Sequence, residues 1–184
     1  MDAFLISTGQ ADSQSYQRIA HAMDRLTQAN IWIYDTPALP ISELRARARR
    51  MKAQHNIDMV VVDYLQLMRG GRQESRVAEV SDISSGLKSI AKELNIPVLA
   101  LSQLSRESER RENRKPQLSD LRDSGSIEQD ADVVLFLYRP GMHKDDVDRS
   151  VTELLVEKNR NGPTTKIDLH FQANQMTFYE PTRE

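Results

Sequence analysis

The sequence predicts an α/β fold, with a largely parallel sheet flanked by helices and antiparallel strands added towards the C-terminus. Short apolar runs alternate with segments whose apolar residues recur every three or four positions, which indicates buried strands separated by amphipathic helices. Beyond Arg139 apolar and polar residues alternate, which is typical of half-exposed antiparallel strands. The 184 residues suit a single domain, residues 1–184, with a core of its own.

Three helices are expected, at residues 14–28, from Ser42 to about residue 55, and at about 77–95. Each carries an apolar stripe at three- and four-residue spacing. The stripe of the third helix consists of Val80, Ile83, Leu87, Ile90 and Leu94. Asp12 or Ser13 can cap the first helix, and Ser42 can cap the second.

The expected core strands are the apolar runs at residues 59–63, 96–103 and 132–138. The segment "IWIYD" at 31–35 has the β-branched and aromatic composition of a strand. Two polar segments separate these elements. Residues 69–76 are expected to form a mobile loop, and residues 104–119 either a disordered lid or a functional loop.

Composition excludes several classes of protein. The chain has no cysteine, which rules out disulfides and thiolate metal sites, and its four histidines are too scattered for a metal motif. No apolar run approaches the ~20 residues that a membrane helix needs, and the N-terminus does not resemble a signal peptide. We therefore expect a cytoplasmic protein without membrane contact. Its net charge of −2 means that nucleic-acid binding would need local basic patches.

Polar residues follow the predicted core strands where ligands bind in open α/β sheets, beyond the carboxyl ends. Asp63 follows "MVVV", and Gln103 follows "VLALS". Asp63 could hold Mg²⁺ through water, and Gln103 could contact a phosphate or position an attacking water. From the spacing alone, Asp63 could equally cap the next turn.

Four strings occur in this order: "VVVDYLQLM", "LKSIAKELNIPVLALSQLSR", "SDLRDSGSIEQDADVVLFLYR" and "EKNRNGP". In these strings the chain resembles the DnaB family of replicative DNA helicases, over the family's C-terminal RecA-like motor domain. The resemblance runs from about Ser7 to Pro181. It implies a RecA-like, P-loop-type domain that belongs to an ATP-dependent DNA helicase.

The resemblance also implies roles for four residues in ATP hydrolysis. Asp63 matches the Walker B acid that organises Mg²⁺, and Gln103 matches the glutamine that senses the γ-phosphate. Lys158 and Arg160 match two basic residues that reach the ATP site of the next subunit. Residues two apart in a strand project to the same face, and cations supplied in trans stabilise the charge that develops in phosphoryl transfer. The alternative for this pair is an ordinary solvated strand face.

Arg122, Asp123 and Gly125 match the family loop that grips the phosphate backbone of single-stranded DNA. An arginine beside small residues can bring guanidinium and amide donors close to a phosphate, and glycine permits close backbone approach. The family usually has glutamate where this chain has Asp123, so that contact is expected to differ. Alternatively, Arg122 pairs with Asp120 or Asp123.

The phosphate loop of such domains, G-x-x-x-x-G-K-[ST], is not found in the 184 residues. None of the seven glycines precedes Lys-Ser or Lys-Thr, and "SSGLKS" around Gly86 lies inside a helical pattern. The family's catalytic glutamate and N-terminal helical domain also have no counterpart. We therefore expect a partial motor domain that lacks the first (Walker A) strand and helix and that is inactive by itself.

For the complete protein, the resemblance implies ATP and Mg²⁺ as cofactors. The implied partners are single-stranded DNA, identical subunits in a hexameric ring, primase and a helicase loader. Two alternatives stay open: a RecA- or RadA-like recombination or repair ATPase, and a non-catalytic, truncated partner that joins rings or binds DNA. The strings "DYLQLM" and "SIEQDAD" favour the helicase.

Overall fold

The computed structural model describes residues 3–10, 12–71, 75–105, 107–111, 114–124, 126–143 and 146–181. The chain divides into two compact units. One comprises Met1–Tyr34, Leu137–Leu154 and Lys166–Glu184, and the other comprises Asp35–Phe136 and Leu155–Thr165. We call the second the site unit, because it contains every candidate functional residue. The expectation of a single domain stays a prediction.

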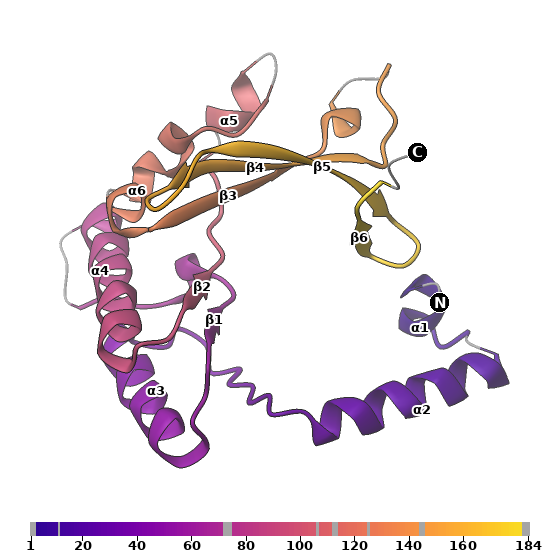
Figure 1. The fold of residues 1–184 in the computed structure, drawn as a ribbon, viewed down its shortest axis with the longest axis horizontal. Helices are drawn as coiled ribbons and strands as arrows, with labels where there is room; N and C mark the ends of the chain where they lie inside the picture. The colour runs from indigo at the N-terminus through magenta and orange to yellow at the C-terminus, as the bar shows by residue number, and fades with distance from the viewer. Residues whose placement is uncertain are drawn as a thin grey trace. The chain divides into compact units, whose positions relative to one another are not determined.

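The site unit contains two short parallel strands (Figure 1). β1 (Val60–Val62) pairs with β2 (Val98–Ala100) in the register Val60↔Val98 and Val62↔Ala100. Between them the chain forms α4 (Arg76–Leu94), which contacts β2, and α3 (Ile41–His55) packs against α4. The predicted strand–helix–strand alternation with parallel pairing is therefore confirmed.

The core of the site unit is built on the apolar stripe of α4. Val80, Ile83, Leu87 and Ile90 are all buried, and the side chains of Ile83 and Ile90 are completely inaccessible. Gly86 allows α3 to approach closely, because a Cβ at Gly86 would lie 2.3 Å from Cγ1 of Ile41. The stripe predicted from the spacing is thus the one that packs.

Helix ends follow local capping chemistry. Ser75 caps α4 by accepting a hydrogen bond from the amide of Ala78, and Asn95 ends the helix in the left-handed conformation (φ 51°). α3 begins at Ile41 after Pro40, with no side-chain cap. The prediction that Ser42 caps this helix is therefore wrong, because Ser42 lies inside its first turn.

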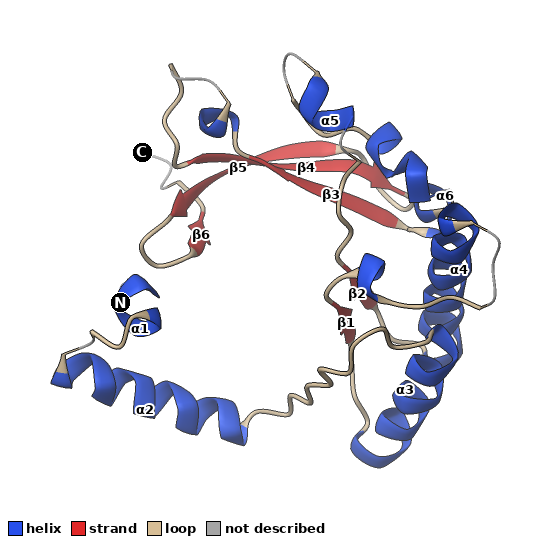
Figure 2. Cartoon of the chain, turned by 180° about the vertical axis from the view of Figure 1, so that it is seen from behind, coloured by secondary structure: helices blue, strands red, loops and turns tan. Residues whose placement is uncertain are grey.

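A four-stranded sheet has the order β3-β4-β5-β6 (Figure 2). Its strands are β3 (Val133–Tyr138), β4 (Val151–Asn159), β5 (Thr165–Gln172) and β6 (Thr177–Tyr179). β5 and β6 pair antiparallel, as predicted for this end of the chain. Val134, Phe136 and Tyr138 of β3 are buried and alternate with exposed residues, so only one face of β3 is covered.

Shorter elements connect the strands and helices. They are η1 (Leu65–Leu67), α5 (Glu107–Arg110), η2 (Leu118–Ser124), α6 (Ile127–Asp130) and η3 (Pro140–Met142). η2 and α6 both contact α4. The polar segment at 104–119, expected as a lid or loop, contains α5 and leads into η2.

The N-terminal part of the other unit consists of α1 (Ala3–Ser7) and α2 (Ser13–Gln28). Asp12 caps α2, because its carboxylate accepts a hydrogen bond of 2.8 Å from the amide of Ser15. Residues 31–35 have irregular backbone and pair with no strand, so the strand-like composition of "IWIYD" is not realised there. Among the described residues, no helix is both long enough and apolar enough to cross a bilayer.

Candidate functional site

Asp63 and Gln103 emerge from the same end of two paired strands. Asp63 directly follows β1, and Gln103 lies three residues beyond β2. The pairing continues past the strands, since the amide of Leu101 donates to the carbonyl of Val62 and the amide of Leu65 donates to the carbonyl of Leu101, both at 2.9 Å. The parallel register therefore brings together the two residues that the sequence predicted separately.

The Asp63 side chain is exposed, and the Asp63–Tyr64 peptide bond is cis. An accessible carboxylate at the carboxyl end of a strand suits Mg²⁺, which is commonly held through one or two carboxylates and retained waters. Asp63 would hold the ion, which would supply positive charge beside a bound phosphate. The fit to the ion therefore rests on Asp63, because the described residues contribute no phosphate loop.

Gln66 is a site residue that we did not predict. Its side-chain amide lies between the two strand ends and makes three hydrogen bonds. Nε2 donates to Oγ of Ser102 at 3.1 Å and to the carbonyl of Gln103 at 3.2 Å, and Oε1 accepts from the amide of Gln103 at 3.1 Å. One side chain thus satisfies both backbone groups of Gln103. The only signal in the sequence was a polar residue inside the apolar run "DYLQLM".

The start of α4 anchors the chain beyond Gln66. Arg76 donates to the carbonyl of Gln66 at 2.6 Å and pairs with Glu79. Glu79 and Asp82 accept from the amides of Gly70 and Gly71, at 3.2 and 2.7 Å. The Arg76 hydrogen bond lowers the pKa of Glu79 below its ordinary value. The described beginning of the expected mobile loop is therefore tied to α4, whereas residues 72–74 lie outside the described residues.

The predicted DNA-contacting loop begins in η2. Arg122 and Asp123 lie in this 3₁₀ helix, but their side chains and Gly125 lie outside the described part of the structure. The base of η2 is well anchored. Asp120 is buried, pairs with Arg111, and accepts from the amide of Gln117 at 2.8 Å. Asp120, one of the two carboxylates named as alternative partners for Arg122, thus already binds another arginine.

Lys158 lies near the end of β4, and Arg160 directly follows this strand. Nζ of Lys158 lies 2.6 Å from the carbonyl oxygen of Glu128 and 3.4 Å from that of Gln129. Nη2 of Arg160 lies 3.3 Å from the same Gln129 oxygen. Both cations therefore lie on one side of the strand end, as the spacing predicted, and both contact α6.

α3 carries several basic residues, and three of its arginines form ion pairs. Arg45 and Arg49 both pair with Glu93 of α4, and Arg47 pairs with Glu43 on its own helix. The two arginines on Glu93, with Arg49 contributing most, lower the pKa of this carboxyl group to about 2. Arg45 and Arg49 therefore connect α3 to α4.

Comparisons with known proteins identify the fold. The family model described as "DnaB-like helicase C terminal domain" matches residues 1–180. The chain belongs to this family. A solved structure described as the "ATPase Domain of G40P" matches 98% of the chain and 66% of that protein's chain, with a TM-score of 0.91 and 33% identity. A DnaB-like replicative helicase described in its interactions with primase has the same TM-score and identity, over 45% of its chain.

Named relatives include the replicative DNA helicase DnaB of Rickettsia typhi and that of Geobacillus stearothermophilus. They are 44% identical over 97% of the chain and 46% identical over 90% of it. These matches cover 40% and 37% of the relatives' own lengths. The chain therefore spans about two fifths of these relatives and is a partial RecA-like α/β domain of the DnaB-like family.

Proposed function

We propose that this chain is part of the motor domain of a replicative DNA helicase, which couples ATP hydrolysis to movement along single-stranded DNA and to duplex unwinding. The observation that carries the proposal is the family match over residues 1–180, within which Asp63 and Gln103 follow the ends of two neighbouring parallel strands. We propose further that residues 1–184 form one partial domain. ATP and Mg²⁺ are the cofactors, with Asp63 as the Mg²⁺-organising acid and Gln103 as the γ-phosphate sensor.

The proposed assembly is a hexameric ring of identical subunits around single-stranded DNA. Lys158 and Arg160 of one subunit act at the ATP site of the next, and Arg122, Asp123 and Gly125 contact the DNA backbone. Primase is a proposed partner, because one structural neighbour is described in its interactions with primase. A helicase loader is the remaining proposed partner.

The decisive experiment compares unwinding with strand exchange in a complete chain that carries this domain. We expect ATP- and Mg²⁺-dependent unwinding of a forked duplex and no exchange between homologous strands. Strand exchange without fork unwinding would instead support the recombination or repair ATPase. DNA binding or ring joining without ATP hydrolysis would support the non-catalytic partner.

Arg160→Ala tests the proposed trans role. Arg160 would stabilise the negative charge that develops during phosphoryl transfer. Its removal should reduce DNA-stimulated ATP hydrolysis by about 10³-fold or more and leave ATP binding intact. Steady-state hydrolysis and equilibrium nucleotide binding measure the two effects. Arg50→Ala, on the exposed face of α3, is the control. Normal turnover in Arg160→Ala would refute the trans role.

Arg122→Ala tests the proposed DNA contact. Losing one phosphate contact should weaken binding to all single-stranded sequences alike and reduce the slope of log K against log[salt] by about 0.7. Titrations at several salt concentrations give this slope, again with Arg50→Ala as the control. An unchanged slope would remove Arg122 from the phosphate contacts.

A further inference from the structure

The C-terminal end of the short helix α6 contacts Lys158 of β4 and Arg160, which follows this strand. At the C-terminus of α6, the amide of Ala131 donates a hydrogen bond to the carbonyl of Ile127 at 3.0 Å. The carbonyls at a helix C-terminus lack amide partners within the helix and carry partial negative charge. Lys158 contacts the carbonyls of Glu128 and Gln129, and Arg160 contacts that of Gln129. The carbonyl groups at the end of α6 therefore bind both cations.

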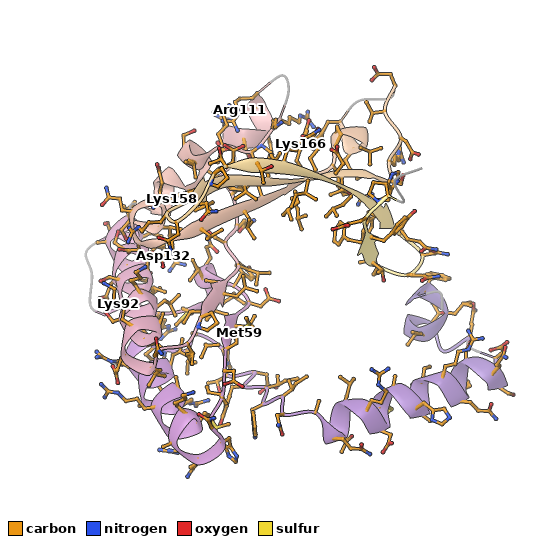
Figure 3. All side chains as sticks on the ribbon, viewed as in Figure 1. Met59, Lys92, Arg111, Asp132, Lys158 and Lys166 are labelled. Atoms are coloured by element: carbon orange, nitrogen blue, oxygen red, sulfur yellow. The ribbon has the colours of Figure 1, made fainter. Side chains whose placement is uncertain are left out.

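Asp132, just beyond α6, adds a second set of contacts to Arg160. Its Oδ1 lies 3.3 Å from Nη1 of Arg160, and its carbonyl oxygen accepts from the Arg160 amide at 2.8 Å. Its other carboxylate oxygen, Oδ2, pairs with Lys88 of α4. Figure 3 shows Asp132 and Lys158 near each other, Asp132 just before β3 and Lys158 near the end of β4. Asp132 thus joins Arg160 to α4.

These contacts leave Arg160 able to act. The Arg160 side chain is 52% exposed; Nη1 contacts Asp132 and Nη2 contacts Gln129. A guanidinium group has five N–H donors, so others stay available for a phosphate. The pKa of Asp132 is lowered, chiefly by the Lys88 hydrogen bond and further by the charges of Lys88, Arg160 and Lys158, so Asp132 stays ionised.

We propose that Asp132 is a positioning residue for Arg160: its carboxylate, balanced by Lys88, orients the guanidinium for its action at the neighbouring subunit's ATP site. This inference rests on the trans role proposed above. An ion pair at this exposure contributes little to stability, because water screens it. Its effect should therefore be on orientation, and misplacing a reacting group by about 1 Å can cost on the order of 10²-fold in rate.

The first test is Asp132→Asn in a complete chain that carries this domain. We expect kcat for DNA-stimulated ATP hydrolysis to fall by on the order of tenfold or more, with KM for ATP unchanged. Asp132→Glu should retain more activity than Asp132→Asn, because it keeps the charge. The matched control is Asp168→Asn, which removes an exposed carboxylate paired with Lys166 on β5. Loss of ring assembly or of ATP-analogue binding in Asp132→Asn would assign a structural role and overturn the proposal.

The second test mixes variant subunits in one ring. Asp63→Asn disables a subunit's own ATP site, whereas Asp132→Asn impairs the cation that the subunit lends to its neighbour. Some interfaces in a mixed ring then combine an intact Asp63 with an intact Asp132. We expect the mixture to hydrolyse ATP faster than either variant alone. A mixture of Arg160→Ala and Asp63→Asn should recover in the same way.

The two mixtures separate the inference from the function on which it rests. Recovery with Arg160→Ala but not with Asp132→Asn would show that Asp132 acts within its own subunit, which overturns this inference alone. No recovery in either mixture would overturn the trans role of Arg160 and the positioning role of Asp132 together.

Discussion

At the scale of single residues, side-chain amides and carboxylates replace backbone pairing where the regular structure ends. The side chain of Gln66 binds both backbone groups of Gln103. The carboxylate of Asp132 binds the guanidinium of Arg160, while its backbone carbonyl still pairs with the Arg160 amide. Buried or half-buried polar groups are costly when unpaired, so such contacts determine where irregular backbone lies. In each case a residue with no predicted role holds a residue that has one.

Gln66→Met tests this at the strand ends. Methionine matches the size of glutamine but cannot bond to Gln103 or Ser102, so the segment after β2 should open more often. We expect faster amide hydrogen exchange in a peptide that spans residues 101–104 and a loss of about 1 kcal/mol of stability. Gln54→Met, on the exposed part of α3, is the control. Unchanged exchange at residues 101–104 would mean that Gln66 does not hold Gln103.

At the scale of elements, α4 organises the site unit. Its buried stripe supplies the core, its first turns hold the chain after η1, and Lys88 reaches Asp132. The periodicity of residues 77–95 predicts this helix well, because the 3.6-residue repeat is a local property. The same periodicity does not reveal that α3 packs at Gly86, because that contact depends on how two distant segments meet.

Gly86→Ala tests the α3–α4 contact. Alanine is the better helix former by about 1 kcal/mol, but here its Cβ would overlap the Ile41 side chain, and overpacking costs about 1–3 kcal/mol. We expect a net loss of stability in Gly86→Ala, measured by denaturant unfolding. Adding Ile41→Ala removes the overlapping atoms, so the double variant should be more stable than the sum of the single effects predicts. Simple additivity would contradict this packing.

At the scale of the whole molecule, the chain is a partial RecA-like domain whose parallel pair β1–β2 and four-stranded sheet β3-β4-β5-β6 are separate sheets. In the site unit, Val61 and Leu99 are 57% and 49% exposed, so the face of β1 and β2 away from α4 is open in this chain. The sequence of these 184 residues also contains no phosphate loop. The nucleotide site is therefore expected to be incomplete in these 184 residues.

Nucleotide binding by the 184-residue chain tests that expectation. Without a phosphate loop, Asp63 and Gln103 cannot surround the phosphates, so we expect neither tight binding nor hydrolysis. Titration of a fluorescent ATP analogue with and without Mg²⁺ measures this. A longer chain that includes the phosphate loop serves as the positive control. Tight, Mg²⁺-dependent binding by the 184 residues would contradict the prediction.

The sequence by itself determined the family, the α/β class, the main helices, the core strands and the strand-end positions of Asp63 and Gln103. These properties depend on local periodicity and on motifs, which need no knowledge of how distant segments meet. Only the tertiary structure decided that Gln66 holds Gln103 and that Lys88, Asp132 and Arg160 converge beside α6. Those contacts join residues 28 to 44 positions apart in the chain, so they depend on register and packing. The strand-like composition of residues 31–35 does not give a strand for the same reason, since a strand needs a partner that composition does not supply.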